Sequence, residues 1–130
     1  MSNLPDYKGK QKVLYIESTP AMTLTSMGER YLEEDRISDA IEFFQKAAYR
    51  EGLEKILEIA VESGDVMDFQ QVLKALGREA TDEEWNRIGQ RAMALKKYTF
   101  ALQAFEKSRN EQEMARLKEK ISTEGTSRES

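Results

Sequence analysis

The side chains that most often carry out chemistry in enzymes are absent from this sequence. Its 130 residues include no histidine and no cysteine, so the commonest general base, the commonest metal ligand and the thiolate nucleophile are all missing. Catalysis would then require paired carboxylates, a lysine nucleophile or a bound metal ion. Carboxylates are abundant, but their spacing places them on the solvent-facing sides of helices. We therefore expect no enzymatic activity, no catalytic residues, no cofactor and no metal.

Two short motifs contain residue types that bind ligands in other proteins. Glu33-Glu34-Asp35 is a run of carboxylates that could hold a metal ion, although such a run at a helix end is more often simply solvated. Gly9-Lys10-Gln11-Lys12 has the Gly-Lys pair of a phosphate-binding loop. It lacks the glycine-rich run before that pair and the serine or threonine after it. Neither motif therefore predicts a ligand site.

The composition fits a single soluble domain that can bury a core. Charged residues make up 34% of the chain and hydrophobic residues 39%, with a formal net charge of −4. This charge disfavours nucleic-acid binding, which needs a basic surface. No apolar run approaches the about 20 residues that span a bilayer, and Val13–Ile16 is too short for the apolar core of a signal peptide. We therefore expect a cytoplasmic location, with neither nucleic acid nor membrane as a partner.

Apolar residues recur at spacings of three and four, which predicts seven helices and no sheet. Thr19 is expected to cap the first helix, and Gly52 to end the second. Thr81 and Glu84 have the spacing of a capping box, and Asn110 is expected to cap the last helix. The predicted helices cover about 20–34, 38–50, 53–63, 66–76, 82–95 and 98–108, and a seventh begins near 111.

The two ends of the chain have a different character from the helical region. Residues 1–19 are predicted to form a flexible N-terminal arm, 20–121 the helical domain and 122–130 a disordered tail without apolar residues. The apolar stretch Lys12–Glu17 has two interpretations. It packs on the first helix, or it forms a short strand that pairs with a partner chain.

Two stretches of the chain repeat the same residue types at a fixed offset. An offset of 61 residues relates Leu24, Met27, Gly28, Ala40 and Phe44 to Trp85, Ile88, Gly89, Ala101 and Phe105. The segment between them has room for one more helix pair. This pattern predicts an all-α protein, an antiparallel helix-hairpin solenoid in which each hairpin covers the next. The alternative is an irregular helical bundle without a binding groove.

The repeated residues resemble the tetratricopeptide repeat family. The resemblance rests on Trp85-x-x-Ile88-Gly89 followed by Ala101-x-x-x-Phe105, and on Gly28-x-x-Tyr31 followed by Ala40-x-x-x-Phe44. It covers about 21–113 as three repeats. The middle repeat is degenerate, with Leu57 in place of glycine and Phe69 in place of alanine, and no repeat has the family's closing proline. The resemblance implies a superhelix with a C-terminal capping helix and a role in protein–protein interaction.

In a superhelix of this kind the first helix of each hairpin lines the concave side. The resemblance therefore implies a partner-binding groove made of Met22, Thr25, Glu29, Leu32, Glu33, Glu51, Glu54, Glu58, Val61, Glu62, Glu83, Asn86, Gln90 and Met93. Glutamate is the commonest of these residues, no lysine or arginine is among them, and four are apolar. Such a groove would bind a basic or amphipathic peptide or helix, and its methionines would suit an adaptable surface. The simpler interpretation is that these residues only form the solvated side of three helices.

Two functions fit this sequence. The first is an adaptor or scaffold that holds a peptide or helix of a partner protein in the acidic groove. The second is a small acidic chaperone or self-associating scaffold of the same family, a homodimer formed through the N-terminal segment. One well-known groove of the family binds a C-terminal carboxylate with basic residues and asparagine. Thr25 and Glu29 occupy two of those places here and only Arg87 is compatible, which argues against that kind of receptor.

Overall fold

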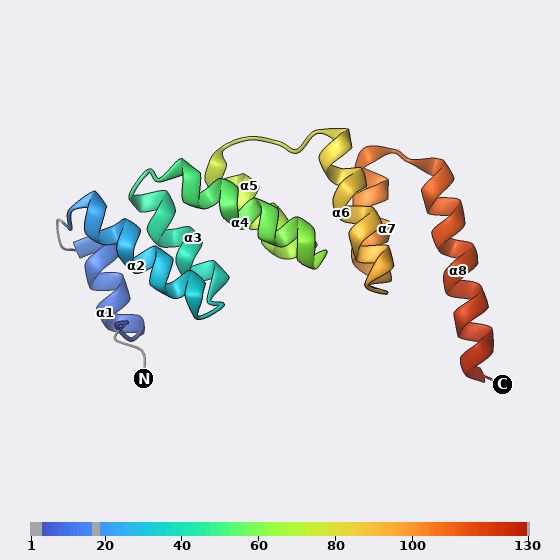
Figure 1. Cartoon of the computed structure of the whole chain (residues 1–130), viewed down its shortest axis with the longest axis horizontal. Helices are drawn as coiled ribbons and strands as arrows, with labels where there is room; N and C mark the ends of the chain where they lie inside the picture. Colours follow the sequence, from blue (N-terminus) through green and yellow to red (C-terminus); the bar gives the residue numbers. More distant parts are fainter. Residues whose placement is uncertain (1–3, 17–18, 130) are drawn as a thin grey trace. The chain divides into compact units, whose positions relative to one another are not determined.

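The computed structural model describes residues 4–16 and 19–129, and this part of the chain is helical with no strand. It begins with the short helix α1 (Tyr7–Gln11) and a π-helical turn, η1 (Lys12–Ile16). Three helix pairs follow: α2 (Ala21–Glu33) and α3 (Ile37–Lys46), α4 (Arg50–Ser63) and α5 (Val66–Leu76), α6 (Asp82–Ala94) and α7 (Tyr98–Ser108). The helix α8 (Glu111–Glu129) comes last (Figure 1). The predicted all-α class is confirmed.

Each helix pair contains two residues with a left-handed backbone conformation. One lies in the turn between the two helices: Asp35 (φ 59°), Gly64 (φ 63°) and Lys96 (φ 61°). The other follows the second helix: Ala48 (φ 54°), Gly77 (φ 71°) and Arg109 (φ 58°). A residue in this conformation commonly ends a helix because it lets nearby N–H groups bond the last carbonyls. In every pair the second residue lies thirteen positions after the first, so the three pairs share one backbone plan.

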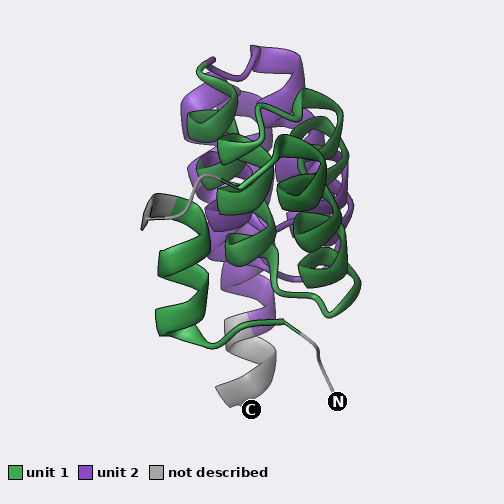
Figure 2. Ribbon diagram, turned by 90° about the vertical axis from the view of Figure 1, so that its left-hand side faces the viewer, with its two compact units in different colours: residues 1–57, 71–77 green, residues 58–70, 78–130 purple. Residues whose placement is uncertain are grey.

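The chain forms two compact units, coloured separately in Figure 2. Unit 1 contains residues 1–57 and 71–77, and unit 2 contains residues 58–70 and 78–130. Both α4 and α5 therefore contribute to both units. The first hairpin, α2–α3, belongs to unit 1, whereas the last hairpin, α6–α7, and α8 belong to unit 2.

In unit 1, α2 and α3 meet where a glycine lies against an aromatic ring. A Cβ on Gly28 would come within 2.6 Å of the Cδ1 and Cε1 atoms of Phe44, so only glycine fits there. Ala40 and Tyr31 are fully buried beside this contact, and the Tyr31 ring centroid lies 5.1 Å from that of Phe43. Gly28 therefore marks the close contact between α2 and α3.

In unit 2, α6 and α7 make the equivalent contact. A Cβ on Gly89 would lie 2.6 Å from Cε1 of Phe105, and Ala101 is fully buried. The helix α8 packs on α7 and adds Leu117, which is fully buried, to the cluster of Ala92, Ala101 and Phe105. Leu117 and the partly buried Met114 of α8 therefore complete the core of this unit, whereas Ile121 is 39% exposed.

The N-terminal segment differs from the flexible arm that the sequence predicts. Residues 7–16 are helical, and Lys10 and Leu14 are buried. Nζ of Lys10 lies 2.7 Å from Oδ1 of Asp39 and 3.0 Å from Oε1 of Glu42, so ion pairs fasten the segment to α3. The strand considered for Lys12–Glu17 is wrong for residues 12–16, which form η1, while Glu17 lies outside the described residues. The alternative was packing on the first helix, and Leu14 of this stretch is buried.

Two predictions about helix ends are also wrong. Thr19 does not cap α2, because its hydroxyl donates to the carbonyl of Val13 at 3.2 Å and Pro20 occupies the N-cap position. Gly52 does not end a helix. It lies in the first turn of α4, where a Cβ would meet Cδ2 of Phe44 at 2.7 Å, so it serves a close contact.

Two other caps have the predicted geometry. Thr81 and Glu84 form a complete capping box at the start of α6. The side chain of Asn110 accepts a hydrogen bond of 3.1 Å from the backbone N–H of Glu113 at the start of α8. The carboxylate of Glu113 pairs with Arg116 at 2.9 Å.

At the C-terminus, α8 continues to Glu129, whereas the sequence predicts a disordered tail from residue 122. The Tyr98 hydroxyl donates to the Glu124 carboxylate at 2.6 Å, and the Thr123 hydroxyl donates to the Glu119 carbonyl at 2.9 Å. These bonds support the helix beyond its last apolar residue. Among the described residues, no helix combines the length and apolar character needed to cross a membrane.

Candidate protein-interaction surface

The candidate residues of the first hairpin lie along α2. Met22 is 82% exposed, Glu29 and Glu33 are exposed, and Thr25 and Leu32 are half-buried. Met22, Glu29 and Glu33 are separated by seven and four residues, so they share one side of the helix. We call these three residues the α2 stripe. Among the residues that the structure describes, neither glutamate of the stripe takes part in an ion pair.

The candidate residues of α4 have mixed surroundings. Glu51, Glu58 and Glu62 are exposed and Glu54 is half-buried. Val61, predicted to be an exposed apolar residue of the groove, is only 5% exposed. Val61 is buried because the apolar face of α4 is wider than predicted. The buried residues of this helix include Leu53, Ile56, Leu57, Ala60 and Val61.

The candidate residues of α6 are also only partly available. Glu83 and Gln90 are exposed, and Met93 is half-buried against the core cluster of unit 2. Asn86 has a structural role, because its Oδ1 accepts hydrogen bonds from the Ser108 hydroxyl at 2.7 Å and from Asn110 Nδ2 at 3.0 Å. Asn86 thus ties α6 to the link between α7 and α8.

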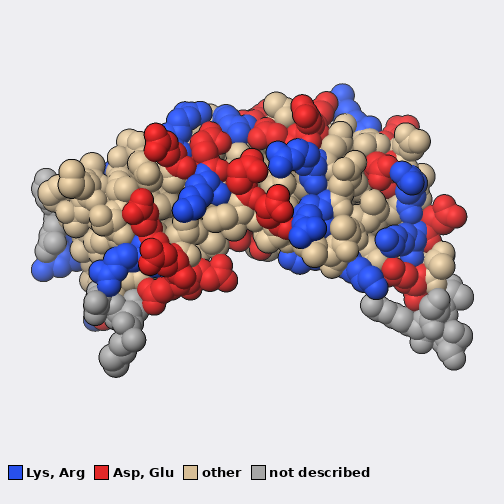
Figure 3. All heavy atoms as spheres, viewed as in Figure 1, with Lys and Arg blue, Asp and Glu red and all other residues tan. Residues whose placement is uncertain are grey.

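Two arginines of α6 that were not predicted to belong to this surface bond to residues of α4. Nη2 of Arg87 is 3.5 Å from Oε2 of Glu58, and Nε of Arg91 donates to the carbonyl of Glu62 at 2.6 Å. Glu58 and Glu62 are four residues apart on α4, as are Arg87 and Arg91 on α6. This matched spacing is the feature of the sequence from which the bonds between α4 and α6 could have been predicted. On the face drawn in Figure 3, acidic and basic side chains are likewise interspersed.

One carboxylate of unit 2 is strongly perturbed. Arg78 donates from Nη1 and Nη2 to the two oxygens of Glu84, at 2.9 and 3.0 Å. These hydrogen bonds, with those from Thr81, outweigh partial burial and lower the pKa of Glu84 to about 2. Because Glu84 also completes the capping box, this pair fixes the segment before α6.

The acidic run at the end of α2 does not gather into a metal site. Within the described residues, no group of three or more aspartate or glutamate side chains is arranged to hold a metal ion. What the α2 stripe offers is two exposed carboxylates and one exposed thioether side chain. These groups are suited to non-covalent recognition.

A scan against models of known protein families and searches of curated proteins and of solved structures gave no match for this chain.

Proposed function

We propose that this chain is a non-enzymatic helical-repeat protein, similar to the tetratricopeptide family, that binds a partner protein. The observation that carries the proposal is the backbone plan of its three helix pairs, with left-handed residues thirteen positions apart in each. The contacts of Gly28 with Phe44 and of Gly89 with Phe105 support the same conclusion, because these residues carry the family resemblance. Hairpins of this kind stack into a solenoid that presents an extended binding surface.

The α2 stripe is the part of the surface that we expect to contribute most. Its two glutamates are exposed and take part in no ion pair among the described residues, whereas the exposed Glu58 on α4 pairs with Arg87 at 3.5 Å. Two exposed carboxylates one helical turn apart attract lysine and arginine side chains, and the exposed methionine adds an adaptable apolar contact. The partner is therefore a basic, amphipathic peptide or helix.

The test is a double charge reversal on the α2 stripe, Glu29→Lys with Glu33→Lys. Tagged wild-type and variant chains would capture proteins from an extract of the source cells, with quantification by mass spectrometry. Proteins held by the wild type should be depleted with the variant. Their capture should also weaken with salt, because the Debye length falls from about 10 Å at 0.1 M to about 3 Å at 1 M.

The matched control is a reversal of two exposed glutamates on α8, Glu111→Lys with Glu119→Lys. It changes the net charge equally and should leave capture unchanged. Circular dichroism would verify that both variants remain helical. Equal capture by the α2 variant and the wild type, or capture that strengthens in salt, would refute the proposed surface.

Self-association through the N-terminal segment is the competing function. Lys10 and Leu14 are buried, and Lys10 pairs with α3 of its own chain, so we expect a monomer. Light scattering of the full chain over a hundredfold concentration range should give one constant mass. A mass that doubles with concentration would favour the self-associating scaffold instead.

A further inference from the structure

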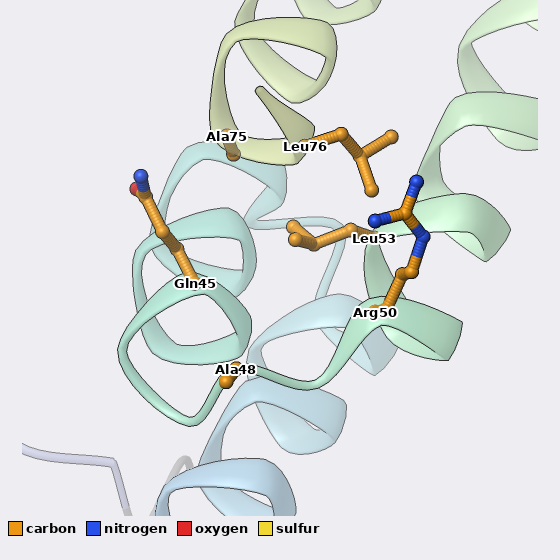
Figure 4. Close-up of a pocket in the computed structure, with 6 residues that line it drawn as sticks. All are labelled: Gln45, Ala48, Arg50, Leu53, Ala75 and Leu76. Atoms are coloured by element: carbon orange, nitrogen blue, oxygen red, sulfur yellow. The ribbon is translucent and has the colours of Figure 1, made fainter. Parts of the chain in front are cut away.

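A small pocket opens in unit 1 where the end of α3, the start of α4 and the end of α5 come together (Figure 4). Its volume is about 250 Å³, and it is lined by Gln45, Ala48, Arg50, Leu53, Ala75 and Leu76. None of these residues belongs to the α2 stripe. The pocket is therefore a separate feature from the proposed protein-interaction surface.

The pocket combines an apolar centre with two different polar walls. Leu53 is 4% exposed and Leu76 is half-buried, and Figure 4 shows both between Gln45 on one side and Arg50 on the other. Arg50 is also the first residue of α4, so the positive end of that helix lies at the same wall. This lining favours a ligand that is apolar in the middle and anionic at the Arg50 wall.

The volume limits the size of the ligand. Sites for drug-sized molecules usually occupy about 300–1,000 Å³, so this pocket has room for about one aliphatic side chain and its polar ends. The guanidinium of Arg50 matches a carboxylate. The side-chain oxygen of Gln45 can accept a hydrogen bond from an amide N–H.

We propose that this pocket binds an aliphatic amino-acid residue with a free carboxylate and an acylated nitrogen. In a cell this is the C-terminal residue of a protein chain, of leucine or isoleucine size. Its side chain contacts Leu53 and Leu76, its carboxylate pairs with Arg50 and its amide N–H donates to Gln45.

Glu54 competes with the ligand carboxylate for the guanidinium of Arg50. Its Oε1 lies 3.8 Å from Nε of Arg50, so a bound carboxylate would be repelled by Glu54 and would share the guanidinium with it. Removing this charge with Glu54→Gln should therefore strengthen binding. A pocket that held only apolar groups would not respond to that change.

The experiment titrates the full chain with three probes and follows the methyl resonances of Leu53 and Leu76 by NMR. N-acetyl-leucine carries all the required groups, N-acetyl-leucinamide lacks the carboxylate, and 4-methylpentanoate lacks the amide. N-acetyl-leucine should shift both leucines and bind at least about tenfold more tightly than the leucinamide. It should also bind more tightly than 4-methylpentanoate. Equal or tighter binding of 4-methylpentanoate would overturn the chain terminus as the occupant, in favour of a free acid.

Three variants and one control complete the test. Arg50→Gln should weaken N-acetyl-leucine binding by about tenfold or more, and Glu54→Gln should strengthen it about twofold to fivefold. Ala75→Ile should abolish it by filling the pocket, whereas Ala94→Ile, at an exposed position of α6, should not. The proposal fails if the leucinamide binds as well as the acid, if Arg50→Gln has no effect, or if neither leucine shifts.

Discussion

Tyr31 in the first hairpin and Ala92 in the last hold the same position, 61 residues apart, but different groups cover them. The Tyr31 hydroxyl donates to the carbonyl of Pro5 at 3.3 Å, so the N-terminal segment covers α2 there. Ala92 leaves room for the turn after α4, where a Cβ on Gly64 would come within 2.9 Å of Ala92 Cα. The size of the residue at this position therefore follows from what lies next to the hairpin.

The cations that follow these positions show the same difference. Nζ of Lys97 donates to the carbonyl of Ser63 at 2.6 Å. Arg36, at the equivalent position, lies 4.6 Å from the Tyr31 ring centroid and pairs with Asp39 at 2.9 Å. The small residues and phenylalanines inside the two hairpins are alike. The residues that contact the segment lying against each hairpin differ. Internal contacts and neighbour contacts are thus set by different residues.

The largest expected effect comes from removing the Tyr31 ring, because the equivalent position of the last hairpin has alanine, Ala92. Tyr31→Ala leaves a cavity at a fully buried site and should lower the free energy of unfolding by about 3–5 kcal/mol, as for other buried aromatic residues. Urea denaturation would measure it. Tyr31→Phe keeps the ring and loses only the bond to Pro5, so it should cost about 1 kcal/mol. A similar loss for both variants would mean that the hydroxyl, not the ring, holds the segment.

The next effect tests the contact that the two hairpins share. Ala101→Leu forces extra atoms between α6 and α7 and should cost about 1–3 kcal/mol, and Ala40→Leu should cost a similar amount in the first hairpin. Chemical denaturation midpoints would measure both. The control Ala94→Leu, at an exposed site of α6, should change the midpoint little. If only one of the two buried variants is destabilised, the helix contact does not contribute equally to the stability of the two hairpins.

A third prediction makes the last hairpin sensitive to acid. The folded pKa of Glu84, about 2, is below its ordinary value of 4.5. Its contribution to stability is therefore fully present above pH 4.5 and is lost as the pH falls towards 2. Glu84→Gln should cost about 1–2 kcal/mol at pH 7 for this partly exposed pair.

The chain has one tryptophan, Trp85, whose ring centroid lies 4.9 Å from that of Phe69, so its fluorescence reports on unit 2. Between pH 5 and pH 2.5 the Glu84→Gln variant should lose less stability than the wild type in denaturation followed by this signal. Equal losses in the two proteins would show that Glu84 is not the group that titrates. The glutamine side chain of the variant can retain the capping bond, which isolates the effect of the charge.

The smallest effect concerns the N-terminal segment of the first hairpin, at the opposite end of the pH scale. Burial lowers the pKa of Lys10, but hydrogen bonds to Asp39 and Glu42 outweigh burial and raise it above its ordinary 10.5. The stability it contributes is fully present below pH 10.5 and is lost as the pH rises through the higher folded pKa. Lys10→Met should cost about 1 kcal/mol at pH 8.

Denaturation at pH 8 and at pH 11.5 would measure this effect, and the cost of Lys10→Met should shrink at the higher pH. Lys8→Met changes an exposed lysine nearby and should be neutral at both. A cost that stays the same at pH 11.5 would mean that packing of the lysine stem, rather than its charge, supports the segment.

The sequence predicts the hairpins well because the residues that form them are close in the chain. Gly28 with Phe44, and Thr81 with Glu84, interact within one hairpin or one helix turn, so local spacing is enough to identify them. The ion pair of Lys10 with Asp39 could not be predicted this way. A lysine in a polar stretch is indistinguishable from a solvated one until a distant carboxylate is placed beside it.

The candidate surface was predicted less well than the helices that carry it. Spacing identified the exposed Glu29 and Glu33, but it placed Val61 outside, whereas α4 buries Val61 together with Ala60 and Leu57. It also missed Arg87 and Arg91, whose neighbours lie on another helix. Burial and cross-helix pairing depend on the width of each interface, which the pattern of one helix does not contain.

The left-handed residues of the three helix pairs have a practical consequence for improving thermostability. Gly64 and Gly77 adopt this conformation at little cost, but Asp35, Ala48, Lys96 and Arg109 adopt it with a Cβ. For ordinary L-residues the conformation costs roughly 1–2 kcal/mol. A glycine substitution removes this cost, but it loses more backbone entropy on folding, so the net gain in stability is smaller. Four positions are thus available for stabilising glycine substitutions, and all of them lie outside the α2 stripe.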